Sequence, residues 1–482
     1  MRTNLRGATL RNATHRYKPT PKAAYRLMAS TSCASLAVLL MIVDQTSLLQ
    51  NFTYLGIGNS AVSPSRVFAV VIMSAVVGAI LPGPNRLPGA LVVWVLAIVV
   101  VIPAIALTPQ REPVWFLATV APVIGLVAVV ATFAAIRVQF TIGAGLTRMN
   151  YLWCLALMTF LLLSIVVVEY GLTDGLTSFE SMYQVRAEVE IAAASSSPIA
   201  AYSSGFVLKI LAPALTGLGI LWRRYAFTTM GVAAFYVDYL TQPSKLAVFL
   251  AVLTAVTAVY LRASRREFRA STVAWFVALM TITVSLLFPQ PGNIVFATTV
   301  YRTIYVPLEV GLMWMRHFSQ NPLGLFADAL PFISNGYELS LPKLISVTYG
   351  SGQGNINAHL WVDGYANMGF WGVVIVSALL GITLIAVNVA ARGRDMRASM
   401  LILLGPSVSL TNGSMFTSLL SGGLALAILL VALLPRQGST DLRSTELRGV
   451  AQSGGPSGGA IDQPGPSVAC PTRERSTMQR GS

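Results

Sequence analysis

Apolar segments of nearly membrane-spanning length recur along this chain, and they constrain its fold more than any other feature. A transmembrane helix needs about twenty predominantly apolar residues, because each residue adds about 1.5 Å to a path of about 30 Å. Segments of this kind cover residues 27–43, 67–82, 90–108, 114–136, 151–168, 205–221, 225–240, 245–261, 270–288, 366–391, 398–411 and 416–434. They predict an all-α, polytopic membrane protein with about twelve transmembrane helices. Segment 67–82 is short, and only a tight turn at Asn412 to Ser414 separates the final pair.

The composition agrees with a membrane protein and argues against a nucleic-acid-binding one. Only 11% of the 482 residues are charged and 55% are hydrophobic, whereas soluble domains carry about 25% charged residues. The net charge of +15 is high, but the basic residues gather in the N-terminal tail, residues 1–26, and in short connections between apolar segments. Cytoplasmic connections of membrane proteins concentrate such residues. The charge therefore indicates topology, and no nucleic-acid partner is expected.

The distribution of arginines predicts the orientation. With the N-terminal tail in the cytoplasm, every second connection also faces the cytoplasm, and these connections hold Arg86, Arg137, Arg148, Arg223, Arg224, Arg262, Arg265, Arg266, Arg269, Arg392, Arg394 and Arg397. The connection 169–204 is mainly acidic, as an outward connection should be. Both termini are therefore predicted to be cytoplasmic. The connection 289–365, which precedes the tenth helix, becomes a large extracytoplasmic loop.

The two ends of the chain lie outside the predicted membrane domain, residues 27–435. The basic tail precedes the first apolar segment, and no small-residue cleavage site follows, so a retained first helix is expected rather than a signal peptide. The C-terminal tail, residues 436–482, is rich in Ser, Gly and Pro and is predicted to be disordered. Cys33, Cys154 and Cys470 show neither metal-ligand spacing nor a disulfide framework. No metal or cofactor is expected.

The outward loop 289–365 holds an unusual share of the polar residues of the chain. A loop longer than about 15 residues is usually functional or disordered, and the many aromatic residues of this loop favour a functional one. Arg302 and Arg316 lie in the amphipathic stretch 301–318, which suits a helix along the membrane surface. Arginine binds phosphate oxygens through two parallel hydrogen bonds. Snorkelling to lipid headgroups or pairing with Glu309 is the alternative for both arginines.

Other polar residues near the outward face are further candidates. Lys245 begins the segment 245–261, where it can neutralise a phosphate, anchor the helix at the interface or pair with Asp238. His359 and Asp363 stand four residues apart, so on a helix they would share a face. Either can serve as a general base toward a sugar hydroxyl, or His359 can simply hydrogen-bond within the fold. Trp361 and Tyr365 offer flat faces to sugar rings or join an interfacial aromatic belt, and His317 either contacts substrate or caps the surface helix.

The order of these residues resembles a known enzyme family. Ser244-Lys245 begins a mid-chain helix, Tyr301-Arg302 follows a later helix, and the loop ends in Asn357-Ala-His-Leu-Trp-Val-Asp-Gly-Tyr365. Over roughly residues 225–390 the chain resembles the Wzy-type O-antigen or oligosaccharide repeat-unit polymerases, relatives of the O-antigen ligases. The resemblance implies a metal-independent glycosyltransferase that joins oligosaccharide units carried on undecaprenyl diphosphate, at the outer face of the cytoplasmic membrane.

The resemblance also implies roles for particular residues. The arginines of the family map onto Arg302 and Arg316, and its base falls at His359 or Asp363. The expected catalytic set is therefore Arg302, His359 and Asp363, and the expected substrate-binding set is Lys245, Arg316, His317, Asn357, Trp361 and Tyr365. A chain-length regulator and a flippase are candidate partners, besides the lipid-linked substrate and the bilayer.

Other functions remain open from the sequence alone. In the ligase branch His is typically followed closely by Asn, whereas Leu360 follows His359 here, which favours a polymerase. Another lipid-linked-sugar glycosyltransferase is a related alternative. A polysaccharide transporter or lipid-linked-sugar flippase should bury charged or broken-helix sites near the membrane midplane. Most of the predicted helices lack ionisable residues at their centres, and the polar residues concentrate in the outward loop, which favours chemistry there.

Overall fold

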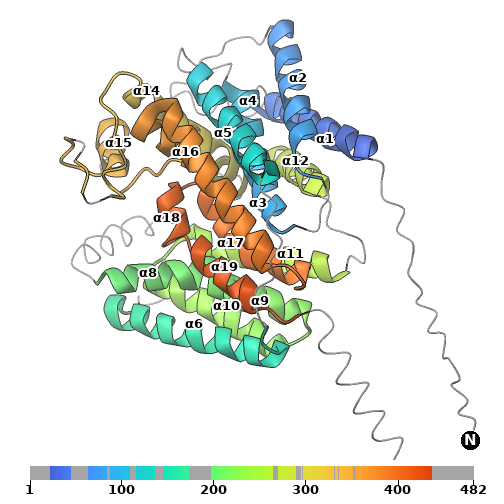
Figure 1. The fold of residues 1–482 in the computed structure, drawn as a ribbon, viewed down its shortest axis with the longest axis vertical. Coiled ribbons are helices and arrows are strands. Elements are labelled where there is room, and N and C mark those ends of the chain that lie inside the picture. The colour runs from blue at the N-terminus through green and yellow to red at the C-terminus, as the bar shows by residue number, and fades with distance from the viewer. Residues whose placement is uncertain are drawn as a thin grey trace, which may run out of the picture. The chain divides into compact units, whose positions relative to one another are not determined.

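A computed structural model describes residues 22–44, 63–83, 87–108, 115–135, 145–172, 197–263, 270–288, 295, 297–330, 332–334, 336–350 and 354–436. All regular elements within these residues are helices, and the predicted all-α class is confirmed for them (Figure 1). Most of the N-terminal tail and the centre of the acidic connection lie outside the described residues. The same holds for the C-terminal tail from residue 437 onward, so the prediction of a disordered tail concerns residues that are not described.

The helices follow each other along the chain in the order expected from the apolar segments. They are α1 (Lys22–Val43), α2 (Pro64–Ile80), α3 (Gly89–Leu96), η3 (Ala97–Val101), α4 (Ile102–Leu107), α5 (Trp115–Ala135), α6 (Arg148–Tyr170), α8 (Pro198–Phe206), η5 (Val207–Leu211), α9 (Ala212–Leu221), α10 (Tyr225–Thr241), α11 (Lys245–Ala263), α12 (Ala270–Leu287), η6 (Ala297–Tyr305), α14 (Val306–Phe318), α15 (Leu341–Tyr349), α16 (Leu360–Ala390), α17 (Met396–Leu410), α18 (Met415–Leu419) and α19 (Leu424–Leu433). The elements η3, η5 and η6 are π-helical.

The helices fit a multi-pass membrane protein. Among the described residues, eight helical stretches are long and apolar enough to cross a membrane, namely 23–43, 89–107, 116–134, 148–170, 199–221, 246–263, 360–390 and 415–433. The helices α2 and α17 are apolar but shorter. Each predicted apolar segment contains a described helix, including α10 and α12. Length and composition therefore support eight membrane-spanning helices among the described residues. The expected number of about twelve is not confirmed.

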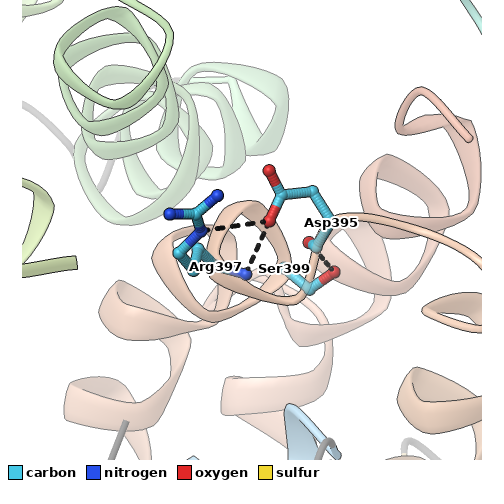
Figure 2. A network of polar contacts seen from close by, with 3 residues as sticks. All are labelled: Asp395, Arg397 and Ser399. Carbon is cyan, nitrogen blue, oxygen red and sulfur yellow. Dashed lines mark hydrogen bonds and ion pairs between the residues drawn. The ribbon is translucent and has the colours of Figure 1, made fainter. Parts of the chain in front are cut away.

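Local sequence explains where several helices begin. Ser63, Thr147, Ser197 and Ser414 precede their helices, and each side chain accepts a hydrogen bond from a backbone N–H of the first turn. Asp395 does the same for α17 (Figure 2), since its Oδ1 accepts from the N–H of Arg397 at 3.0 Å and lies 3.7 Å from the Nε of that residue. These caps satisfy N–H groups that a helix leaves unpaired at its start.

Two differences from the expected loop boundaries follow from such signals. The helix after the acidic connection begins at Pro198, because Ser197 caps it and proline suits the first helical turn. The helix after the long loop begins at Leu360, which places Asp363 in its first turns rather than in the loop. A kink at Met368 and Gly369 then divides α16, and Gly369 takes a positive φ of 60°.

The long loop is largely structured and closes on this kink. The predicted helix 301–318 is confirmed as helical, because η6 continues directly into α14. The backbone N–H groups of Gly324 and Leu325 donate to the carbonyls of Ala366 and Asn367 at 2.9 and 3.0 Å. The Asn367 side chain accepts from the N–H of Phe326 at 2.7 Å. The loop thus satisfies carbonyls that the kink releases from the helix.

Small residues allow the helices to approach closely. Helix α5 lies along α16 (Figure 1), with Gly125 against the Trp361 ring and Gly381 against Thr132. Helices α6, α8, α9 and α10 pack together in another group, and α17 packs on α9, α11 and η5. Packing through glycine is typical of helices in membranes, where apolar lipid removes the hydrophobic drive for association.

Candidate functional site

A cavity of about 530 Å³ joins the long loop to the helices of the membrane domain. Its walls come from α8, η5, α10, the start of α11, η6, α14, the start of α16, and the α17–α18 connection. The charged residues that line it are Lys209, Asp238, Arg302, Asp328 and Asp363. A cavity of this size with a few convergent polar groups is the usual form of a small-molecule site.

Three predicted site residues line this cavity together, namely Arg302, Asn357 and Asp363. Arg302 is exposed on η6, between Tyr301 and Tyr305, whose rings stack with centroids 6.3 Å apart. Both cationic lining residues, Arg302 and Lys209, lie in π-helical elements. Such elements interrupt a regular helix and often occur at functional sites.

Asp363 is half-buried in the first turns of α16. The helix dipole at this terminus favours the ionised carboxylate, whereas burial of the side chain opposes it. Asp328 lines the same cavity and repels the charge of Asp363. The Oδ2 of Asp328 accepts from the N–H of Leu341 at 2.8 Å, so this carboxylate holds the start of α15. Of Asp328 and Asp363, Asp328 therefore holds the start of a helix, and Asp363 is the carboxylate that we consider for chemistry.

His359 faces a different environment. It precedes α16 with an extended backbone, φ −70° and ψ 160°, and is only 4% exposed. Its side chain borders a second, much smaller cavity with apolar walls that include Val99, Ile304 and Leu308. Burial lowers the pKa of His359 to about 3, which leaves the imidazole neutral near pH 7. The Asp363 N–H donates to the His359 carbonyl at 3.1 Å, as in a regular helix, but the two side chains border different cavities.

The remaining predicted residues do not line the large cavity. Trp361 is fully buried against α5 and donates from Nε1 to the Oγ of Ser377 at 3.0 Å, so neither face of its ring is open to a sugar. Tyr365 is half-buried and packs edge-on against Phe370 at 5.4 Å. His317 is buried beside Tyr349, and this burial lowers its pKa.

Two cationic candidates lie near the cavity without lining it. Arg316 is exposed on α14. Lys245 begins α11 directly after Ser244, which does line the cavity, but the Lys245 side chain lies outside the described part of the chain.

The sequence analysis missed a second group of lining residues, which comes from the membrane helices. Lys209 is half-buried in η5 and attracted by Asp238 of α10, which is 1% exposed. The Oγ of Ser204 lies 3.3 Å from both the Asp238 Oδ1 and the Gln242 Oε1. The detectable signal was Lys209, a lysine inside a predicted transmembrane segment, because ionisable residues in such positions usually serve a function.

The α17–α18 connection contributes a wall of hydroxyl and amide groups that the sequence analysis treated only as a tight turn. The lining residues of this wall are Ser409, Thr411, Asn412, Ser414, Thr417, Ser418 and Ser421. Ser414 caps α18 and also donates from Oγ to the Thr417 Oγ1 at 2.8 Å. Short hydroxyl side chains both donate and accept hydrogen bonds, which suits a ligand that is itself rich in hydroxyl groups.

Comparison with known proteins identifies no relative. No family model matches the chain, and no curated protein or solved structure matches it either.

Proposed function

We propose that this protein is a membrane-embedded polymerase that joins oligosaccharide repeat units carried on undecaprenyl diphosphate, at the outer face of the cytoplasmic membrane. The observation that supports this proposal best is the composition of the large cavity. One space combines an exposed arginine, a helix-terminal carboxylate and a wall of hydroxyl groups, and it lies between membrane helices. A diphosphate requires the arginine, and a reacting sugar requires the carboxylate and the hydroxyl groups. A lipid carrier requires a position between membrane helices.

Each substrate group has a matching part of the cavity. Arg302 binds the diphosphate through two parallel hydrogen bonds, and the hydroxyl wall and Asn357 bind sugar hydroxyls. Leu208, Leu246, Phe249 and Val306 supply apolar lining for the first isoprenoid units. The rest of the carrier remains in the bilayer, where apolar chains are stable.

The reaction is a substitution at the anomeric carbon of the growing chain. A hydroxyl of the incoming lipid-linked unit attacks this carbon, a new C–O bond forms, and the bond to the diphosphate oxygen breaks. Asp363 takes the proton of the attacking hydroxyl, a step that typically contributes about a hundredfold to ten-thousandfold. Arg302 stabilises the negative charge that develops on the departing lipid diphosphate.

The test is the lipid-linked glycan pool of a deletion strain, together with conversion by purified protein in liposomes. We expect single repeat units to accumulate in the strain and to be converted to polymer by the protein. Polymer that remains on its lipid carrier in the deletion strain would instead indicate a ligase. Failure of the purified protein to lengthen any lipid-linked unit would contradict the polymerase proposal.

A flippase is the second candidate, because Asp238 is buried and Lys209 is half-buried between the helices that line the cavity, and Lys209 lies in a π-helical element. Charged groups and broken helices inside membrane-spanning segments are typical of transporters. The side of the membrane where single units accumulate separates the two functions. Accumulation at the cytoplasmic face of the deletion strain would indicate the flippase, and accumulation at the outer face would indicate the polymerase.

The orientation is tested independently of activity. Single cysteines introduced at Ser351 and Ser439 are probed on intact cells with an impermeant thiol reagent, in a background without Cys33, Cys154 and Cys470. We expect labelling at Ser351 but not at Ser439, because the long loop is proposed to face outward and the C-terminal tail inward. The reverse result would place the large cavity on the wrong side for this reaction.

A further inference from the structure

The Lys209 region of the cavity has a composition that differs from the Arg302 region. Lys209 and Ser204 come from consecutive turns of η5 and α8, Asp238 lies in α10, which packs on η5, and Gln242 directly follows α10. All four line the cavity. One basic and one acidic side chain that attract each other leave this group without a net charge.

Burying such a pair between membrane helices is unfavourable. Charged groups lose their hydration there, and well-packed apolar residues of similar volume often give a more stable protein. The local contacts do not satisfy the carboxylate either. The Oδ1 of Asp238 is 3.3 Å from the Ser204 hydroxyl, but its Oδ2 is buried and makes no hydrogen bond to the described residues. A buried acceptor without a donor is the kind of group that a ligand satisfies.

The backbone around this group is held firmly in place. Gly405 of α17 packs directly on the backbone of Lys209, and a Cβ at Gly205 of α8 would lie 2.6 Å from the Ser421 carbonyl oxygen. Gly423, with a φ of 80°, packs on Ile210. Side chains longer than hydrogen would separate these elements. The π-helical turn that carries Lys209 is therefore fixed before any ligand binds, which lowers the entropic cost of binding.

The chemistry of the group favours an uncharged, hydroxyl-rich ligand. Lys209 only donates hydrogen bonds, the Asp238 carboxylate only accepts them, and Ser204 and Gln242 do both. Adjacent hydroxyls of a sugar ring can satisfy such a set, whereas a diphosphate would be repelled by Asp238. Ser418 faces the same cavity with a buried Oγ that makes no hydrogen bond to the described residues.

We propose that Ser204, Lys209, Asp238 and Gln242 form a carbohydrate subsite, which binds an uncharged sugar ring of the lipid-linked substrate while Arg302 binds its diphosphate. This inference rests on the proposed function and adds to it the direction in which the bound saccharide lies. The saccharide extends from Arg302 toward the membrane helices that carry Lys209. The subsite then selects repeat units by the hydroxyl pattern of one sugar.

The test uses the full-length protein in lipid nanodiscs and a soluble probe. The probe is the oligosaccharide released by mild acid from the lipid-linked pool of the deletion strain. Its affinity is measured by calorimetry for the wild type, for Lys209→Met/Asp238→Asn and for Asp363→Asn. The double variant removes both charges together, so it avoids leaving one charge buried and unpaired. We expect its affinity to fall at least tenfold, with a thermal unfolding temperature near that of the wild type, whereas Asp363→Asn keeps the affinity and loses turnover.

Other results would overturn the subsite. A double variant that binds the oligosaccharide as tightly as the wild type would show that Lys209 and Asp238 only stabilise the fold. Absence of binding to the wild type would also overturn it. If the double variant does not fold, Gln242→Ala tests the same prediction, because it should keep the thermal stability and lose affinity several-fold. Unchanged affinity in that variant would equally contradict the subsite. Failure of the polymerase proposal can be told apart from failure of the subsite. In that case the wild type does not convert lipid-linked units, whatever its affinity for the oligosaccharide.

Discussion

The cavity has two unlike walls. One comes from the long polar loop and carries Arg302, Asn357 and Asp363, which the sequence indicated. The other comes from apolar membrane helices and carries Lys209, Asp238 and the hydroxyl groups of the α17–α18 connection, which the sequence analysis did not select. A run of polar residues in the sequence indicates part of a site. Single polar residues inside apolar helices can form the rest of the same cavity, and they are easily overlooked. The proposed mechanism divides the work accordingly, with chemistry on the loop wall and sugar recognition on the helix wall.

Removing the base on the loop wall should have the largest effect. Asp363→Asn keeps the size of the side chain and loses the proton acceptor, so turnover should fall about a hundredfold to ten-thousandfold. The measurement is conversion of lipid-linked single units to polymer in liposomes, at matched amounts of inserted protein. Asp328→Asn is the comparison, because the Asp328 carboxylate already accepts from Leu341. If Asp363→Asn retained near wild-type turnover, the loop wall would lose its catalytic assignment.

Arg302 should follow in size of effect. Loss of a charged hydrogen-bond partner weakens transition-state binding by roughly 1.5–3 kcal/mol, which is about tenfold to a hundredfold in rate. Arg302→Ala should show this loss, and Arg302→Lys a partial one, because lysine keeps the charge without the planar fork. Arg316→Ala is the matched control, since Arg316 is exposed on α14 outside the cavity lining. Equal losses in Arg302→Ala and Arg316→Ala would argue against a special role for the cavity arginine.

A substitution at Gly405 should shift the Lys209 side of the cavity without changing any polar side chain. Gly405→Ala places a methyl group against the Lys209 backbone, where no flexible side chain can move aside. Overpacking of this kind costs about 1–3 kcal/mol, and it should also lower oligosaccharide affinity several-fold. Gly311→Ala is the control, because a Cβ at Gly311 meets its nearest atom, the Cγ2 of Val362, at an ordinary 3.5 Å. Thermal unfolding and calorimetry on both variants check this, and equal behaviour of the two would contradict the fixed position of Lys209.

The success and failure of sequence reasoning have physical causes here. Apolar length fixes where helices form, so the all-α membrane class and the positions of the helices were predictable. Spacing alone did not place side chains at a helix terminus. The carbonyl of the N-cap residue His359 accepts the helical hydrogen bond from the Asp363 N–H at 3.1 Å, yet the His359 side chain borders the small apolar cavity and Asp363 lines the large one. Trp361 seemed suited to sugar stacking, but Gly125 of a distant helix receives its ring. Such contacts depend on which helices pack together, and the apolar pattern of one segment does not encode that choice.

His359 should affect the pH dependence of stability but not the pH dependence of turnover. Its pKa is about 3 in the folded protein and about 6.5 in the unfolded chain, so the unfolded chain binds the proton first as pH falls. Stability is fully present above about pH 6.5 and decreases toward pH 3, by about 2 kcal/mol between pH 7 and pH 5. His359→Phe should remove that part of the decrease in thermal unfolding measured in detergent. The pH profile of turnover should show no step near pH 6.5 that disappears in His359→Gln, since the buried imidazole stays neutral and does not change its protonation state there. A titration near pH 6.5 that disappears in His359→Gln would return His359 to the reaction and place the base outside the large cavity.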